Sequence, residues 1–242
     1  MDALELVRLQ ATAWGLRLDD ERLSGLETFA RFLSSYEKAN VIGTRSVPDI
    51  LLEHVLDSLS CFLFDPLCNA GRVADVGSGG GLPGVPLRIF YPRLRVTLIE
   101  ATGKKARFLR RAVESLSLEG VEVLRARVEE VGQTGHYRGA YDVTAARAVA
   151  RLSVVAEYCV PLLRLGGHAL SMKGRLENEE VSEGERAAEM LGAEVREIIR
   201  VPRLTEIGHK QRALVILRKV RETPNTYPRG VGTPAKKPLG IV

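Results

Sequence analysis

The stretch that decides the fold runs from Val73 to Gly84 and reads VADVGSGGGLPG. Its first four residues are mostly apolar and predict a short strand, and the glycines that follow predict a tight turn that opens a helix. Gly77 and Gly79 let the backbone approach a ligand without a Cβ atom in the way. Because doubly wound sheets bind ligands at the carboxyl edge of their strands, we expect a nucleotide-like ligand at this turn.

The turn differs from a dinucleotide-binding loop, which reads Gly-x-Gly-x-x-Gly and aims a helix N-terminus at a pyrophosphate. Counted from Gly77, the third glycine would stand at Leu82, and Pro83 and Pro86 lack the N–H groups that a phosphate needs. S-adenosylmethionine has no phosphate and carries a sulfonium, and Asp75 beside the turn suits a cationic ligand. The sequence therefore favours S-adenosylmethionine as the cofactor.

Strands and helices alternate from Arg72 onward. Short apolar segments separated by helical patterns are typical of a mostly parallel sheet with helices on both faces. The predicted strands are Arg72 to Val76, Arg95 to Ile99, Val121 to Arg125, Tyr141 to Ala145, Gly167 to Met172, Val195 to Val201 and Ala213 to Leu217. The expected fold class is α/β, with a doubly wound, seven-stranded, mostly parallel sheet of the Rossmann-like class I methyltransferase type.

The segments on either side of this region differ from it in composition. Residues 1–66 carry apolar side chains at spacings of three and four, which predicts helices, and Ser46 ahead of Pro48 is expected to cap the third one. Residues 221–242 collect prolines and basic residues without periodicity. We expect a helical N-terminal extension packed on the core (1–66), an S-adenosylmethionine-binding methyltransferase domain (67–220) and a basic, proline-rich C-terminal tail (221–242).

Composition narrows the class of protein and of partner. The 35 Lys and Arg residues outnumber the 30 Asp and Glu residues, and the net charge of +5 favours a polyanionic partner. The chain has no run of roughly 18 apolar residues and no secretory opening, so we expect a cytoplasmic protein without membrane contact. His54 and Asp57 have no further ligand at metal-binding spacing, so we expect no metal site and a hydrogen-bonded packing role for both.

Acidic residues follow the second and third predicted strands. Glu100 stands where an acidic side chain accepts hydrogen bonds from ribose hydroxyls. A surface glutamate is the alternative, and we favour ribose binding because the glycine turn and the strand-terminal acid occur together. Val128 and Glu129 are expected to place an apolar side chain and an acid at an adenine.

Longer motifs resemble one known family. They are Asn40 with the loop after it, His54 to Ser58, Asp75 to Pro86, Gly103 to Arg110, Arg127 to Glu130, Arg147-Ala148, Tyr227 to Arg229 and Pro234 to Pro238. On these motifs the chain resembles, over most of its length, the bacterial small-subunit rRNA guanine-N7 methyltransferases called RsmG or GidB. The glycine turn is common to many methyltransferases, whereas Leu82-Pro83-Gly84 together with the His54 segment is specific. Val41-Ile42 departs from the family, which usually has Leu-Thr after the Asn.

The resemblance implies a reaction and its site. The substrate would be N7 of guanine 527 in the 16S rRNA of the small ribosomal subunit, and S-adenosylmethionine would leave as S-adenosylhomocysteine. The turn and the resemblance together give these expected cofactor-binding residues: Asp75, Gly77, Ser78, Gly79, Leu82, Glu100, Ala101, Thr102, Val128, Glu129 and Arg147.

Guanine N7 carries a free lone pair, so its methylation needs no catalytic base and depends mainly on orientation. Arg147 follows the fourth strand, where substrate and cofactor meet, and we expect it in the catalytic centre together with Asn40. Tyr36, Asn40 and Tyr227 are candidates for stacking on or reading an extruded guanine. The alternatives are core packing for Tyr36 and turn capping for Asn40.

Basic side chains are expected to bind the phosphates of the 16S rRNA, and we expect a monomer on the small subunit. These residues are Arg45, Lys104, Lys105, Arg107, Lys173 and Arg229. The alternative for the basic residues after Gly103 is the solvent-exposed face of an amphipathic helix. The alternative for Lys173 is simple hydration. The sequence leaves open whether the tail orders on RNA or folds over the cofactor.

Other functions share this fold. A NAD-dependent oxidoreductase needs pyrophosphate binding at the first turn, which Leu82-Pro83 disfavours. A non-catalytic RNA-binding Rossmann-like protein would not need the intact ligand turn. A methyltransferase that acts on a small molecule stays open as an alternative, because the residues expected to bind the cofactor do not identify the methyl acceptor.

Overall fold

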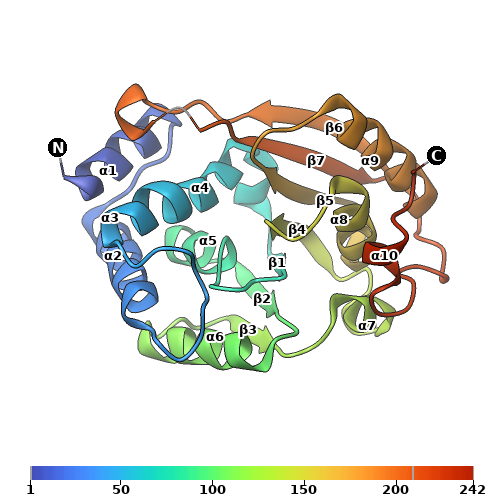
Figure 1. Cartoon of the computed structure of the whole chain (residues 1–242), viewed down its shortest axis with the longest axis horizontal. Coiled ribbons are helices and arrows are strands. Elements are labelled where there is room, and N and C mark those ends of the chain that lie inside the picture. The colour runs from blue at the N-terminus through green and yellow to red at the C-terminus, as the bar shows by residue number, and fades with distance from the viewer. Residues whose placement is uncertain (1, 209, 242) are drawn as a thin grey trace.

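A seven-stranded sheet forms the centre of the computed structural model, which describes residues 2–208 and 210–241 (Figure 1). Its order is β3-β2-β1-β4-β5-β7-β6, and β7 runs antiparallel to both of its neighbours. The strands are β1 (Arg72–Val76), β2 (Arg95–Ile99), β3 (Val121–Leu124), β4 (Tyr141–Arg147), β5 (Leu163–Lys173), β6 (Ala193–Arg200) and β7 (Ala213–Lys219). The predicted fold class is confirmed. The strands β2 and β3 are added on one side of β1, and the strands from β4 onward are added on its other side, so the strand order reverses between β1 and β4.

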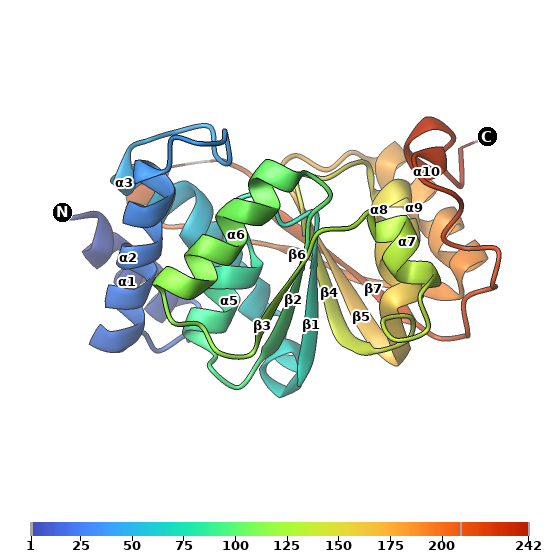
Figure 2. The same cartoon turned by 90° about the horizontal axis from the view of Figure 1, so that it is seen from below.

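Helices cover both faces of the sheet, as Figure 2 shows. One face carries α5 (Gly84–Phe90) and α6 (Gly103–Ser115), and the other carries α7 (Val128–Gln133), α8 (Leu152–Cys159), a short 3₁₀ turn (Val160–Leu162) and α9 (Asn178–Leu191). Residues of β1 alternate between the two cores, because Val73 packs with the first set of helices and Ala74 with the second.

The N-terminal helices pack on the face of α5 and α6. They are α1 (Ala3–Ala13), α2 (Asp20–Ser35), α3 (Val47–Ile50), a π turn (Leu51–Val55), α4 (Leu56–Leu59) and two 3₁₀ turns (Ser60–Leu63 and Asp65–Asn69). The Ser46 hydroxyl accepts a hydrogen bond from the Asp49 N–H at 3.3 Å, which confirms the predicted cap. Leu26 and Phe29 of α2 are fully buried in the same cluster as Leu98 of β2. One core therefore joins the extension to the sheet, and a boundary at residue 66 stays a prediction.

The tail after β7 folds back along α7 and α8 and forms α10 (Thr233–Lys236), drawn in red in Figure 1. Leu239 is buried in the core on that side of the sheet. Arg138 donates to the carbonyls of Thr223 and Tyr227 at 2.8 and 2.7 Å. The remaining helical turn of the described ranges, Thr205–Ile207, joins β6 to β7, and none of the helices described is long and apolar enough to cross a membrane.

Candidate active site

The glycine turn after β1 approaches the chain that follows β4. Gly77 has φ +73°, and its N–H bonds to the Ile99 carbonyl at 2.9 Å. A Cβ atom on Gly77 would lie 2.9 Å from Cγ2 of Val149, so a larger residue is excluded by both conformation and space. The turn therefore brings the carboxyl ends of β1, β2 and β4 together, where the sequence predicts the ligand.

Asp75 supports the turn from beneath. The side chain is fully buried, and its Oδ2 accepts a hydrogen bond from the Gly84 N–H at 3.0 Å. A Cβ atom on Gly84 would lie 2.8 Å from that oxygen, so this close approach requires glycine. Burial raises the pKa of Asp75 to about 7. Asp75 lines neither of the cavities at the turn and contacts the start of α5, so its expected contact with a cationic ligand stays a prediction.

A cavity of about 250 Å³ opens on one side of the turn, and we call it the Glu100 cavity. Its lining combines the ends of β1 and β2, the start of α7, the loop after β4, α8 and the tail. The residues are Val76, Gly77, Ile99, Glu100, Ala101, Thr102, Ala126, Arg127, Val128, Glu129, Val149, Ala150, Tyr158 and Ala235. It contains six of the residues predicted to bind the cofactor: Gly77, Glu100, Ala101, Thr102, Val128 and Glu129.

Two backbone hydrogen bonds fix the carboxylate of Glu100. Oε2 accepts from the Gly79 N–H at 3.0 Å and Oε1 from the Thr102 N–H at 2.6 Å. The residue is only 7% exposed, yet it lines the cavity. Each carboxylate oxygen can accept a further hydrogen bond, so Glu100 can receive hydroxyl donors from a ligand without losing its own support.

The C-terminal tail closes one wall of the Glu100 cavity. Oε1 of Glu129 accepts a hydrogen bond from the Gly232 N–H at 2.9 Å, and Ala235 of α10 lines the cavity. Arg229 binds the fully buried Glu157 through two contacts, Nε to Oε1 at 2.9 Å and Nη2 to Oε2 at 2.6 Å. The ion pair between Arg229 and the buried Glu157 therefore holds the tail over this cavity.

A second cavity, of about 230 Å³, lies on the other side of the turn, and we call it the Arg147 cavity. Its lining comes from the glycine turn, the loop after α2, the π turn, α6 and the end of β4. The residues are Val41, Ile42, Gly43, His54, Gly77, Ser78, Gly79, Gly80, Leu82, Lys105, Arg147 and Ala148. Ala148 has φ +54°, a conformation that is uncommon for alanine and is often found at functional sites.

Arg147 is bound by the N-terminal segment. Its Nε lies 2.9 Å from Oδ2 of Asp57, and its Nη2 lies 2.6 Å from Nδ1 of His54 and 3.3 Å from the Glu53 carbonyl oxygen. The predicted hydrogen-bonded role of His54 and Asp57 is confirmed. Glu53 and His54 stand in the π turn, a feature that frequently marks functional sites.

The proton of His54 is placed by this contact. A guanidinium is always a donor, so Nδ1 of His54 must accept and the ring proton is on Nε2. Burial and the charge of Arg147 lower the pKa of His54 to about 4, so the ring is neutral near pH 7. The cavity thus contains two cations, Lys105 and Arg147, and a neutral imidazole.

Comparisons with known proteins give the family of this fold and site. The family profile described as GidB, rRNA small subunit methyltransferase G, matches residues 22–208. The chain belongs to this family. A curated relative named Ribosomal RNA small subunit methyltransferase G, from Rubrobacter xylanophilus, is 59% identical over 98% of this chain and 91% of its own length. Another of the same name, from Chloroflexus aggregans, is 41% identical over 94% of each chain.

A solved structure outside the GidB family has the same architecture. The branched-chain polyamine synthase C9 mutein from Thermus thermophilus superposes with a TM-score of 0.60 over 85% of this chain and 67% of its own. Its sequence identity is 15%, so the likeness concerns the fold alone. The resemblance to GidB proteins inferred from sequence motifs is confirmed at the family level.

Most residues predicted for the site in this GidB-family chain lie at one of the two cavities. Ser78, Gly79, Leu82 and Arg147 line the Arg147 cavity, and the six named above line the other. Asn40 is exposed and lines neither, although the next three residues, 41–43, line the Arg147 cavity. Its role in the catalytic centre stays a prediction.

Two of the predicted phosphate-binding residues have other partners. Nζ of Lys173 lies 2.7 Å from Oε1 of Glu180 and 2.7 Å from the Ala150 carbonyl oxygen, and the side chain is 10% exposed. Arg229 is neutralised by Glu157, as described above. In this structure Lys173 holds the loop after β4 and Arg229 anchors the tail, and phosphate binding by either residue stays a prediction.

Most of the other basic residues of the predicted phosphate-binding surface are more exposed to solvent than Lys173 and Arg229. Lys104 and Arg107 are exposed on α6, and Lys105 lines the Arg147 cavity. Arg45 is exposed and donates to the backbone carbonyls of Ser34 and Tyr36. Phosphate binding by these four residues stays a prediction.

The aromatic candidates for guanine binding lie away from both cavities. The ring of Tyr36 packs edge-on against Phe108, with 4.8 Å between centroids, so its alternative role in the core is confirmed. Tyr227 belongs to the tail, packs against the core and lines neither cavity. The aromatic residue that lines the Glu100 cavity is Tyr158, which the sequence analysis did not consider.

Glu157 is the most informative residue that the sequence analysis missed. It is the only charged residue of α8, which is otherwise largely apolar. Because an ionised side chain is rarely fully buried without a partner, this lone acid was a signal from which a distant cation could have been predicted. Val149, Ala150 and Ala235 gave no comparable signal, since small apolar residues occur in every loop.

Proposed function

We propose that this chain transfers the methyl group of S-adenosylmethionine to N7 of a guanine in 16S rRNA, at position 527 by family resemblance. The observation that carries the proposal is the pair of cavities that meet at Gly77, at the point where the sheet reverses direction, in a chain of the GidB family. Ligands of open α/β sheets bind at this point.

The Glu100 cavity fits the adenosine half of the cofactor. Glu100 can accept hydrogen bonds from two ribose hydroxyls, because each oxygen keeps a free lone pair. Val128 and Ile99 supply apolar walls for a flat purine, and the tail encloses it from the side of Ala235. No cluster of basic side chains lines this cavity in the described ranges, so it suits an uncharged nucleoside better than a diphosphate.

The Arg147 cavity fits the amino-acid half. Lys105 and Arg147 can pair with the carboxylate of the cofactor, and the turn from Gly77 to Gly79 brings backbone groups to the same place. When bound, S-adenosylmethionine supplies a methyl group activated by its attachment to a positively charged sulfur. The two cavities share Gly77, so one extended ligand can occupy both.

The residues around these cavities orient groups and do not need to move a proton. Guanine N7 has a free lone pair, and His54 is already neutral near pH 7. Asp75 is fully buried beneath the turn and is bound to Gly84. We therefore assign catalysis to proximity and orientation, with Arg147 fixed by Asp57 and His54 as the main positioning group.

Labelled methyl transfer to small ribosomal subunits that lack the modification tests the proposal. We expect label in 16S rRNA and, by mass spectrometry, 7-methylguanine at a single nucleotide. Calorimetry should show micromolar or tighter binding of S-adenosylhomocysteine and no binding of NAD. The proposal fails if NAD binds in place of S-adenosylhomocysteine, or if the labelled nucleotide is methylated elsewhere than at N7 of a guanine.

We further propose that the protein acts as a monomer in the cytoplasm. One chain supplies every wall of both cavities, so a partner copy is not needed to complete the site. The proposed substrate, the small ribosomal subunit, is itself cytoplasmic. Light scattering during gel filtration would give a mass near 26.6 kDa if the first part is correct.

A further inference from the structure

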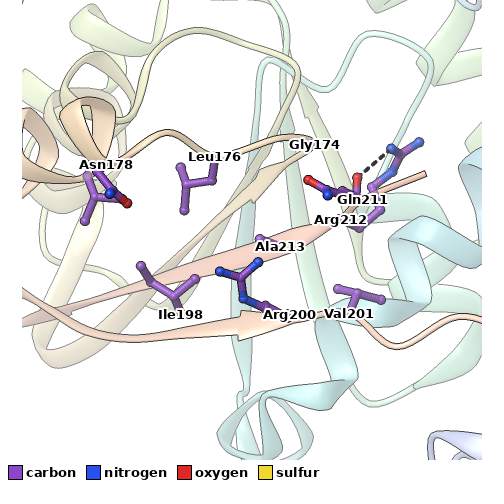
Figure 3. Close-up of a pocket in the computed structure, with 10 residues that line it drawn as sticks. Gly174, Leu176, Asn178, Ile198, Arg200, Val201, Gln211, Arg212 and Ala213 are labelled. Atoms are coloured by element: carbon purple, nitrogen blue, oxygen red, sulfur yellow. Dashed lines mark hydrogen bonds between the residues drawn. The ribbon is translucent and has the colours of Figure 1, made fainter. Parts of the chain in front are cut away.

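A third cavity, of about 310 Å³, lies farther along the carboxyl edge of the sheet and belongs to neither half of the site described above. We call it the Arg200 cavity. It lies between the chain after β5, the first turn of α9, the end of β6 and the start of β7. Figure 3 shows Arg200 beside Ile198 and Ala213, with Leu176 and Asn178 across the cavity.

The lining of this cavity combines cationic, amide and apolar groups. Arg200 is exposed, and no ion pair or side-chain hydrogen bond joins it to another residue of the described ranges. Asn178 and Gln211 add amide side chains, and Leu176 and Ile198 add apolar walls. A guanidinium for phosphate, amides for base edges and apolar walls for a ring together suit a nucleotide of single-stranded RNA.

Two acids that flank the cavity in the sequence have partners other than Arg200. Glu180 in the first turn of α9 accepts from Lys173 and from the Leu152 N–H, at 2.7 and 2.9 Å. Glu177, before that helix, lies 3.8 Å from Arg175. Arg200 therefore stays available to an anionic ligand.

The cavity is close to Arg147 and connected to it. β5 lies next to β4 and β7 lies next to β5, so the start of β7 is about 10 Å from the end of β4. Arg212, which lines the Arg200 cavity, places Nε 3.2 Å from Oδ1 of Asp57, and Arg147 places Nε 2.9 Å from Oδ2 of the same carboxylate. A strand of RNA can span this distance with one or two nucleotides.

We infer that the Arg200 cavity binds an unpaired nucleotide of the rRNA that neighbours the methylated guanine. The phosphate binds Arg200, and the base enters between Leu176 and Ile198, where Asn178 and Gln211 bind its edge. This nucleotide fixes the direction of the RNA strand across the carboxyl edge of the sheet, so the target guanine reaches the cofactor in one orientation. The inference rests on the proposed rRNA substrate.

The test replaces Arg200 and a matched control. Arg218 is also exposed, has no ion pair in the described ranges, and stands on the neighbouring strand β7 at the opposite edge of the sheet. Methyl transfer to unmodified small subunits and to 16S rRNA free of protein would be measured for Arg200→Ala, Ile198→Asp and Arg218→Ala.

We expect Arg200→Ala and Ile198→Asp to raise the KM for RNA about tenfold while the affinity for S-adenosylhomocysteine and the melting temperature stay the same. For Arg200→Ala, the slope of log affinity against log salt should fall by about one, as for one lost phosphate contact. Arg218→Ala should match the wild type.

Three results would overturn the inference: equal KM values for Arg200→Ala and the wild type, an equal loss in Arg218→Ala, or a loss on subunits but not on free rRNA. The last result would assign the cavity to a ribosomal protein. If the wild type itself methylates no RNA, the proposed function has failed and not this cavity.

Discussion

Arg147 links the site to the packing of the N-terminal helices at the level of single residues. Its guanidinium lines a cavity, yet it also neutralises Asp57, whose side chain is only 7% exposed. Removing the cation would leave a buried carboxylate with Arg212 as its remaining partner, so an alanine variant is expected to lose stability as well as activity. A lysine variant separates the two effects.

We expect Arg147→Lys to lower kcat by about 100-fold and to cost less than half of the stability lost in Arg147→Ala, which should be about 3 kcal/mol. Lysine keeps the charge next to Asp57, but it cannot contact Asp57, His54 and the cavity at once. Single-turnover methyl transfer and urea unfolding measure the two quantities. Full activity in Arg147→Lys would show that methyl transfer does not need the several N–H donors of the planar guanidinium.

Asp75 is expected to make stability depend on pH. Its pKa is about 7 in the folded state and near 3.8 when unfolded, so the folded chain holds a proton that the unfolded chain loses. Stability from this group is therefore full below about pH 4 and falls as the pH rises to 7. Asp75→Asn, which can still accept from Gly84, should be more stable than the wild type at pH 8, by about 4 kcal/mol, and equal to it near pH 4.

Asp142→Asn provides a control of opposite sign in the same urea titrations. Despite partial burial, hydrogen bonds from Arg164, Arg72 and Gly71 hold the pKa of Asp142 below its usual value. Its replacement should destabilise the protein at pH 8, and the loss should vanish at low pH. A pH-independent effect of Asp75→Asn would contradict the raised pKa.

Residue types at the site were predictable, and the partners of charged residues were not. The glycine turn and Glu100 follow from local rules on strands and turns, so they were predicted from the sequence. Lys173 and Arg229 looked like free cations because their acids, Glu180 and Glu157, stand on helices that only the fold brings close. A single sequence gives the sign of a charge and not its neighbour.

At the level of elements, the strands were easier to predict than the segments that complete the cavities. All seven strands followed from apolar runs, although β4, β5, β6 and β7 each extend beyond their predicted bounds. The start of β5 pairs with β4 across an irregular register between Tyr141 and Val143. The π turn from Leu51 to Val55 could not be predicted, since it has the composition of an α-helix. The tail has no periodicity, and its position depends on Glu157 and on the packing of Leu239.

The tail is expected to contribute to cofactor affinity through its anchor. In Arg229→Gln, the ion pair with Glu157 is lost and α10 should leave the wall of the Glu100 cavity. We expect about tenfold weaker binding of S-adenosylhomocysteine by calorimetry and faster tryptic cleavage after Lys236. Arg164→Gln, which breaks the more exposed ion pair with Asp142, should change neither. Unchanged affinity in Arg229→Gln would mean that the tail does not enclose the ligand.

At the level of the whole molecule, three cavities lie along one edge of the sheet, and basic side chains surround that edge unevenly. Lys173 and Arg229 are paired with acids, and Arg45, Lys104 and Arg107 are the exposed cations of the predicted phosphate-binding surface. α6 begins at Gly103, directly after the Glu100 cavity residues Ala101 and Thr102. Its exposed cations therefore lie beside the path that we propose for RNA.

We expect a Lys104→Ala and Arg107→Ala double variant to weaken rRNA binding and to reduce the salt slope of affinity by about two, because two phosphate contacts are lost. S-adenosylhomocysteine binding should not change. Filter binding of 16S rRNA at several salt concentrations measures the slope. A wild-type affinity that does not change with salt would contradict phosphate binding by this helix.

The segment that closes the Glu100 cavity is the last part of this sequence to be synthesised. Gly232 and Ala235 follow β7 in the chain, so translation completes every strand before it reaches the segment that closes the Glu100 cavity. Translation that stops within the tail would therefore leave all seven strands in the chain and remove one wall of the nucleoside pocket. Such a shortened protein is expected to retain its methyl donor poorly.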